Sequence, residues 1–358
     1  MHEAKRRLDR MVDGVLDISG LNLTSLDWML EHPKFNEIRD LNCNSNRLTS
    51  LPKWPLVEVV DCRYNNQLTS LPCWSMVKEV HCNHNQLTSL PEWPLVEFVN
   101  CYDNRLISLP KWPLVKKVFC SSNQLKTLPC WPLVEEVICG ENQLSSLPEW
   151  PLVEEVHSEY NQHKSLPCWP LVKKVYCNNN QLTSLPVWPL VEEVNCSYNQ
   201  LTSLPEWPLV WQVLCDNNPL SFLPEWPQVK VVHCRRNRLT FLPKWPLVSQ
   251  VYCGHNRLTW LPLWSSLITV GCKNNPLPYT GNEYLTQLRK LIGLISYLRA
   301  KEVVARWRKY TRTSVAKKKE GVHLELKYSP DLPFVWRTPE ARHWLERIIE
   351  TGWRARVK

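Results

Sequence analysis

The chain alternates apolar and polar residues over short stretches that recur along most of its length. In one of them Val194 and Cys196 are separated by a single polar residue, which is the pattern of a β-strand with one buried face. Asn199 follows where the chain must turn, and its amide can satisfy backbone groups of the turn. Each stretch therefore predicts a short strand that ends in an asparagine turn.

A return segment follows each turn and carries apolar residues at a different spacing. Leu201, Leu204 and Trp207 are placed to point inward from this segment. Pro205 and Pro208 exclude an α-helix there and favour polyproline II or a short 3-10 turn. We expect the return segments to lie opposite the strands.

Strand, turn and return segment form a unit of nineteen residues, L-P-x-W-P-L-V-x-x-V-x-C-x-x-N-x-L-x-S, that recurs from about Leu51 to Leu277. A short fixed period predicts a solenoid, because one unit buries its apolar face only against its neighbours. We expect an α/β repeat: a right-handed coil with a parallel β-sheet on the concave face and polyproline II or 3-10 segments on the convex face. Residues of one type then stack in columns, such as Cys82, Cys101 and Cys120, Asn85, Asn104 and Asn123, and Trp93, Trp112 and Trp131.

This unit resembles the leucine-rich repeat family in its L-x-x-L-x-L-x-x-N-x-L-x-x-L-P form. The residues that carry the match in one copy are Val77, Val80, Cys82, Asn85, Leu87, Leu90 and Pro91. The short, helix-free unit is similar to repeats of secreted bacterial effectors, whose consensus carries L-P-x-L-P. Trp in place of the second Leu, and Cys in the strand, look more like arrays encoded by giant DNA viruses of the marseillevirus type. The resemblance implies a protein-binding role and a viral origin.

Three regions are expected from the changes in pattern. Residues 1–14 are charged and amphipathic and predict a helical N-terminal cap. Residues 15–278 hold a degenerate first repeat and about thirteen further ones, with one inserted residue at Asn65-Asn66. Residues 279–358 no longer repeat and predict a small basic α+β capping region, with a strand over 322–328 and a helix beginning near Thr338.

One repeat breaks the pattern of its neighbours twice. Ser158 stands in the Cys column and His163 stands where Leu belongs. One interpretation is drift, with the two side chains hydrogen-bonded to each other. The other is a polar pocket or a pH-sensitive position in the middle of the coil.

Aromatic and imidazole side chains recur at exposed positions of the predicted concave face. Such a stripe on a rigid scaffold is typical of a binding surface, although rings on neighbouring strands also stabilise a sheet by packing on one another. The candidate partner-binding residues are His81, Tyr102, Phe119, His157, Tyr160, Tyr176, Tyr198, His233 and Tyr252.

Charge is distributed unevenly. The formal net charge is +9, and residues 285–358 hold 18 Lys and Arg against 7 Asp and Glu, a net of +11 that leaves −2 for the rest. Within the repeats, Lys pairs and Glu pairs occur near the strand starts, which favours a solvated ladder of exposed ion pairs, with recognition of a charged partner as the alternative. The basic C-terminal region is either a solvated cap or a contact for nucleic acid, an acidic protein or anionic lipid. Its candidate contact residues are Arg306, Arg308, Lys309, Arg312, Lys317, Lys318 and Lys319.

The fifteen cysteines favour free thiols over disulfides. The column cysteines occupy apolar strand positions, where free Cys behaves as a small hydrophobe, and Ser158 interrupts the strict pairing that a bridged column would need. Thiols are typical of a reducing compartment. The N-terminus has no apolar signal region, and the longest apolar stretch is too short to span a bilayer. We therefore expect a cytoplasmic protein (host cytoplasm for a viral one) or a virion component, not a secreted protein and not one with a transmembrane segment.

Catalysis finds no support in the sequence. Gly-rich phosphate loops, H-E-x-x-H, G-x-S-x-G and C-x-x-C are absent, and no cofactor or metal is expected. Some bacterial effectors with similar repeats carry a C-terminal ubiquitin-ligase domain with a catalytic Cys, but no Cys follows Cys272 here. The sequence predicts a non-enzymatic protein-interaction scaffold. A structural or minor capsid component of a virion is the alternative, and an adaptor for a host ubiquitin ligase is a third hypothesis.

Overall fold

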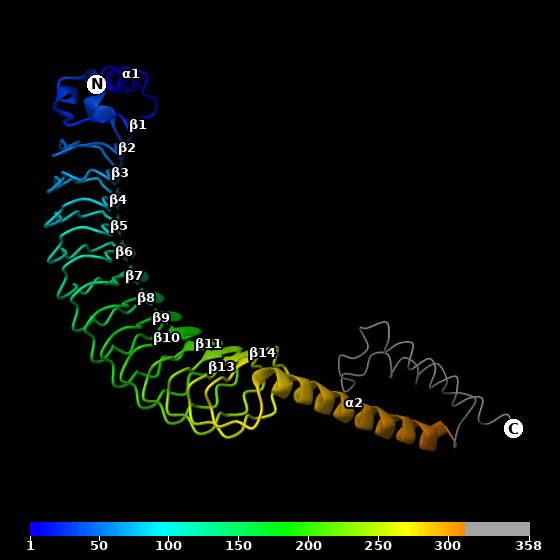
Figure 1. Cartoon of the computed structure of the whole chain (residues 1–358). Coiled ribbons are helices and arrows are strands. Elements are labelled where there is room, and N and C mark those ends of the chain that lie inside the picture. Colours follow the sequence, from blue (N-terminus) through cyan, green and yellow to red (C-terminus); the bar gives the residue numbers. More distant parts are fainter. Residues whose placement is uncertain (312–358) are drawn as a thin grey trace. The chain divides into compact units, whose positions relative to one another are not determined.

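The structure is a computed structural model that describes residues 1–311. The chain divides into two units, Met1–Gly281 and Asn282–Lys358. The first unit contains a short helix, two 3-10 helices and a parallel 14-stranded sheet in which every strand pairs with the next one along the sequence. Its strands line the inner side of a curved coil, and the return segments lie outside (Figure 1). The leucine-rich repeat solenoid expected from the sequence is therefore confirmed.

Each strand has three residues and its middle residue faces the core. The strands are β1 (Val15–Asp17), β2 (Asp40–Asn42), β3 (Val59–Asp61), β4 (Glu79–His81), β5 (Phe98–Asn100), β6 (Lys117–Phe119), β7 (Glu136–Ile138), β8 (Glu155–His157), β9 (Lys174–Tyr176), β10 (Glu193–Asn195), β11 (Gln212–Leu214), β12 (Val231–His233), β13 (Gln250–Tyr252) and β14 (Thr269–Gly271). From β2 onwards successive strands are in register at the nineteen-residue period, and the step from Val59 to Glu79 absorbs the inserted residue. First and third strand residues therefore form continuous rows on the concave face.

Helical segments lie at the two ends of the repeats. α1 (His2–Asp9) buries Ala4 and Leu8 and matches the expected cap. The 3-10 helices η1 (Asp27–Met29) and η2 (Pro33–Glu37) lie between β1 and β2. The second unit begins within α2 (Gly281–Thr311). The strand and the helix expected over 322–328 and after residue 338 lie outside the described residues.

The side-chain amides of the asparagine column form hydrogen bonds with backbone groups of their own repeat and of the preceding repeat. Asn142 Nδ2 donates to the carbonyls of Cys139 and Gly140 in its own repeat and to that of Cys120 in the preceding one, at 3.0–3.1 Å. Its Oδ1 accepts from the Leu125 backbone N–H at 3.0 Å. The amide thus satisfies buried backbone groups that the turn would leave unpaired.

Tryptophans form the second column, on the return side of the core. Twelve indoles from Trp54 to Trp264 are fully buried, with successive ring centroids 5.9–6.2 Å apart. From Trp74 onwards each indole N–H donates to the proline carbonyl of the preceding repeat, as Trp150 does to Pro129 at 3.1 Å. Neighbouring strands are only about 4.8 Å apart. Successive repeats are therefore farther apart at their indoles than at their strands, and this difference in spacing curves the coil towards its sheet.

A third regularity escaped the sequence analysis. The residue before each column asparagine has a left-handed backbone, with φ of 52–58° from Ser45 to Asn274, and none of these thirteen residues is Gly. The conformation lets the backbone N–H of this residue donate to the next repeat, as Tyr198 does to Asp216 at 2.8 Å. Inter-repeat pairing therefore continues past the strands into the turns.

Candidate concave binding face

The central stripe, defined as the third residues of the strands, carries most of the candidate binding side chains. All of them are partly exposed, and they pair across neighbouring strands. His157 stacks on Tyr176 with ring centroids 4.4 Å apart, and His233 meets Tyr252 edge to face at 4.5 Å. The Arg235 guanidinium lies 4.7 Å from the centre of the Tyr252 ring. The stripe thus contains preformed ring pairs instead of isolated rings.

Two stripe residues near the N-terminal end are bridged by a ring that the sequence analysis missed. Phe98, the first residue of β5, lies 5.1 Å from His81 and 5.2 Å from Phe119 between ring centroids. Phe98 stands in a row otherwise occupied mostly by charged residues. That substitution was visible in the sequence, and so was its place on the concave face.

The candidate tyrosines outside the stripe lie beyond the ends of the strands. Tyr102 follows β5 by two residues, and Tyr160 and Tyr198 lie three residues beyond β8 and β10 with left-handed backbones. Their exposed fractions are 39%, 55% and 52%. They lie in the turns at the edge of the concave face, because the strands end one residue before the cysteine column.

Hydrogen bonds and burial fix the protonation of several groups on this face. Burial and a hydrogen bond to Glu193, 2.9 Å from the hydroxyl, raise the pKa of Tyr176 to about 12. Burial works to raise the pKa of Glu155, but the hydrogen bonds from His157 and Lys174 outweigh it and the pKa is lowered. Burial lowers the pKa of His233. At neutral pH the Tyr176 phenol is therefore neutral and the Glu155 carboxylate is charged.

Ser158 and His163 do not form the hydrogen bond that one interpretation assumed. Both side chains are fully buried, and neither the Ser158 hydroxyl nor a ring nitrogen of His163 makes a hydrogen bond of good geometry with a described residue. Burial lowers the pKa of His163 to about 4, and the Ser145 backbone, which approaches the ring without good hydrogen-bond geometry, opposes this shift only in part. The repeat of β8 consequently contains polar groups in an otherwise apolar core.

A second aromatic group lies away from the stripe. Phe222, Phe241 and Trp260 occupy successive repeats and are 44–50% exposed. They replace the Ser that most earlier copies carry before L-P, such as Ser203. This run of three departures from the repeat was the available signal for a further exposed surface, which we name the loop-side patch.

The basic candidates fall in two groups. Arg306, Arg308 and Lys309 belong to α2. Arg312 and the run Lys317, Lys318 and Lys319 lie outside the described residues.

The cysteines are free thiols. Twelve are buried, and burial raises the pKa of the column members, to about 12 for Cys101 and Cys196. Cys73, Cys130 and Cys168 are exposed on the return segments. Among residues 1–311 no group of three or more His, Cys, Asp or Glu side chains could hold a metal ion. Within the same part of the chain, no helix combines the length and hydropathy of a membrane span.

Sheet, asparagine column and period together define a leucine-rich repeat solenoid with units of nineteen residues. Solved structures of YopM are similar to it. YopM from Yersinia enterocolitica WA-314 is 28% identical with a TM-score of 0.66, over 68% of this chain and 57% of that one. YopM from Yersinia pestis, described as a leucine-rich effector protein, is 26% identical with a TM-score of 0.64, over 78% and 89% of the two chains. This chain thus spans less than two thirds of the first YopM and most of the second.

More distant solved structures share the fold alone. The leucine-rich repeat domain of APL1B is 19% identical with a TM-score of 0.55, over 76% of this chain and 84% of that one. A scan against models of protein families gave no match, and a search of the curated proteins gave none.

Proposed function

We propose that this chain is a non-enzymatic scaffold that binds a protein partner on its concave face. The observation that carries the proposal is the central stripe, where ring pairs such as His157 with Tyr176 are partly exposed on a rigid sheet. Rigid aromatic side chains lose little conformational entropy on binding and are enriched at interface hot spots. The description of the similar Yersinia pestis protein as an effector supports an interaction role.

The competing explanation is that the rings only stabilise the sheet by packing across strands. Affinity capture with the full chain separates the two, using one variant of the stripe and one of the loop-side patch that restores the Ser of earlier repeats. The two variants are Phe119→Ala/His157→Ala/Tyr176→Ala/Tyr252→Ala and Phe222→Ser/Phe241→Ser/Trp260→Ser. We expect the first to lose its ligands while its circular dichroism spectrum stays that of the natural chain, and the second to keep them. The reverse result would place the binding surface on the loop side.

The basic C-terminal region is proposed as a second contact, for an acidic protein or nucleic acid. Its net charge of +11 over residues 285–358 supports this role. A chain ending near residue 282 should lose binding to polyanions and keep the ligands of the stripe. Equal binding of a labelled oligonucleotide by both lengths would show that the region is only a solvated cap.

A structural role in a virion is the alternative function. The Trp and Cys columns, which resemble arrays of giant DNA viruses, favour a viral origin, and the free thiols favour action in a reducing compartment such as host cytoplasm. Proteomics of purified particles separates the alternatives, because a structural component has a high and fixed copy number. The ubiquitin-ligase adaptor hypothesis has no recruiting motif to support it.

A further inference from the structure

Charged side chains at the strand starts form ion pairs between neighbouring repeats. Lys117 of β6 lies 2.8 Å from the Glu136 carboxylate of β7, and Lys174 of β9 lies 3.3 Å from Glu155 of β8. The residues just before the strands do the same, since Lys173 lies 2.8 Å from Glu154. Opposite charges in register across adjacent strands stabilise a sheet.

This alternation fails between β7 and β8. Glu136 is in register with Glu155, so that like charges stand side by side, which destabilises a sheet. Residues 135–141 and 154–160 hold six Glu and neither Lys nor Arg. We name these six carboxylates the acidic patch: Glu135, Glu136, Glu141, Glu154, Glu155 and Glu159.

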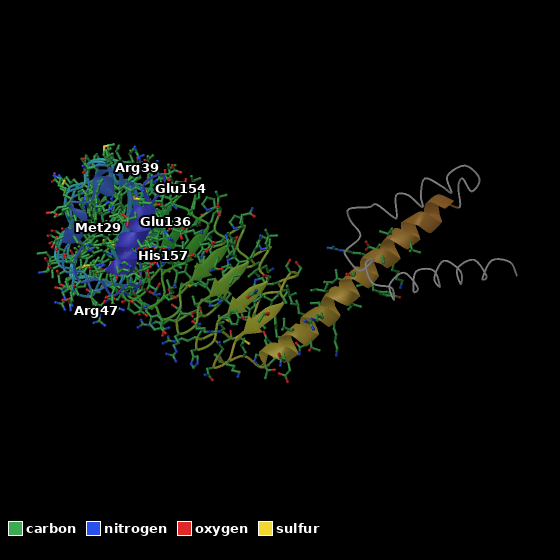
Figure 2. The ribbon with its side chains drawn as sticks, turned by 90° about the horizontal axis from the view of Figure 1, so that it is seen from above. Met29, Arg39, Arg47, Glu136, Glu154 and His157 are labelled. Atoms are coloured by element: carbon green, nitrogen blue, oxygen red, sulfur yellow. The ribbon has the colours of Figure 1, made fainter. Side chains whose placement is uncertain are left out.

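Lysines of the flanking strands compensate only part of the acidic patch. Glu136, Glu154 and Glu155 have the ion pairs described above, whereas Glu135, Glu141 and Glu159 make no ion pair with a described residue. Figure 2, which views the coil from above, labels Glu136, Glu154 and His157. The sheet face therefore keeps uncompensated negative charge at the middle of its length.

Glu159 adds an independent observation. Its side chain lies over Gly140, where an added Cβ would be 2.8 Å from Oε1. Its other oxygen, Oε2, is shielded from solvent and has no hydrogen-bond partner among the described residues. A carboxylate oxygen without a donor raises the free energy of the unbound chain. Glu159 as a whole is partly exposed, so a rotation of its side chain would bring this oxygen to an arriving cationic donor.

Aromatic rings lie next to the acidic patch, where an arginine guanidinium could stack on them. His157, on β8, stacks on Tyr176 of the next strand and bonds to Glu155 through its Nε2 at 2.8 Å. Arginine pairs with carboxylates through two parallel hydrogen bonds and also stacks on aromatic faces. The combination of carboxylates and partly exposed rings fits arginine better than any other side chain.

We propose that the acidic patch on β7 and β8 binds an arginine- and lysine-rich segment of a protein partner. The proposal rests on the function proposed above and specifies the partner's chemistry. Nucleic acid does not fit this face, because its phosphates carry the same sign of charge as the patch.

The test is selection of peptides from a random library displayed on phage, against the full chain, followed by affinity measurements with synthetic labelled copies. Two variants each remove four carboxylates, one set from the acidic patch and one set from exposed positions on the return segments. They are Glu135→Gln/Glu136→Gln/Glu154→Gln/Glu155→Gln and Glu92→Gln/Glu149→Gln/Glu206→Gln/Glu225→Gln. Thermal unfolding of both variants checks that the fold is retained.

We expect arginine- and lysine-rich peptides whose affinity falls at least tenfold in the patch variant, falls with added salt and is unchanged in the return-segment variant. Apolar or acidic peptides that depend on the stripe residues and not on the patch would overturn this inference and leave the concave binding role standing. Peptides insensitive to every concave substitution would overturn both. Arginine-rich peptides that bind the two variants equally would reflect general attraction to carboxylates and would also refute the proposal.

Discussion

Replacing His163 by Leu should stabilise the solenoid and remove part of its sensitivity to acid. The ring is fully buried without a hydrogen bond of good geometry to a described residue, and Leu144 and Leu182, its equivalents in the adjacent repeats, are fully buried as well. Leu therefore fits this position in the repeat. Removing polar atoms that are desolvated and unpaired should stabilise the fold by about 2 kcal/mol at pH 7.5.

Protonation makes the difference larger at low pH. The pKa of His163 is lowered to about 4 by burial, against 6.5 for an ordinary His. Between these values the unfolded chain binds a proton that the folded chain does not, so the free energy of unfolding falls as the pH falls. The loss is about 2 kcal/mol at pH 5 and reaches about 3 kcal/mol at pH 4, whereas this contribution is absent above pH 7.

Urea unfolding of the natural chain and the His163→Leu variant at pH 7.5 and pH 5 measures this effect. The difference in the free energy of unfolding between the two chains should grow by about 2 kcal/mol on acidification. Every other titrating group is the same in both chains, so its contribution cancels in this difference. The mirror variant Leu144→His places the same ring in the adjacent repeat and should become less stable and more acid-sensitive. A stability difference that does not change between the two pH values would refute a neutral, buried His163.

Three further results are expected. Trp150→Phe should destabilise the fold by about 2–3 kcal/mol, because the Pro129 carbonyl loses its donor. Trp54→Phe should destabilise it less, since the buried Trp54 N–H has no partner among the described residues. Thermal unfolding of the two variants measures this difference. Asn142→Ala should cost at least about 3 kcal/mol and increase amide hydrogen exchange in its own and the preceding repeat, and unchanged exchange there would contradict the bridging role of the amide. A thiol reagent should modify three cysteines rapidly in the folded chain and the other twelve only after denaturation, because burial raises their pKa; rapid loss of more than three thiols would contradict the buried column.

Most of the scaffold could be predicted, because the same residue pattern, with the same structural requirements, recurs in every repeat. The alternation around Val194 gave the strand, and the recurrent Asn gave a turn whose amide spans two repeats. The left-handed residue before each Asn could not be predicted, because thirteen different copies use side chains from Ser to Tyr and the usual Gly signal is missing. Its conformation is fixed by inter-repeat hydrogen bonds, which no single repeat displays.

The candidate site was predicted less completely, for reasons of geometry. His157 and Tyr176 were expected on one face, and the register places them in stacking contact. That Tyr160 lies in a turn beyond β8 could not be predicted, because a period-2 pattern does not show where a strand ends. The ladder of Lys and Glu pairs was expected, and ion pairs such as Lys117 with Glu136 are present. The ring contacts of Phe98 were missed, because they join positions on adjacent repeats and become apparent only when the repeats are aligned as a stack.

Core and face of the repeat of β8 depart from the pattern together, and this coincidence bears on function. Ser158 and His163 weaken the core at the repeat whose Glu155 stands beside Glu136 with the same charge. Each departure costs stability, and the solenoid can absorb the cost because its repeats contribute nearly independently to stability. A core defect alone is explained by drift in a redundant array. Drift does not explain why six carboxylates gather on the strand side of two adjacent repeats while the flanking repeats keep their lysines there, since a single Lys in place of Glu135 or Glu154 would restore opposite charges. A cationic partner, which needs the negative charge to remain uncompensated, accounts for that arrangement.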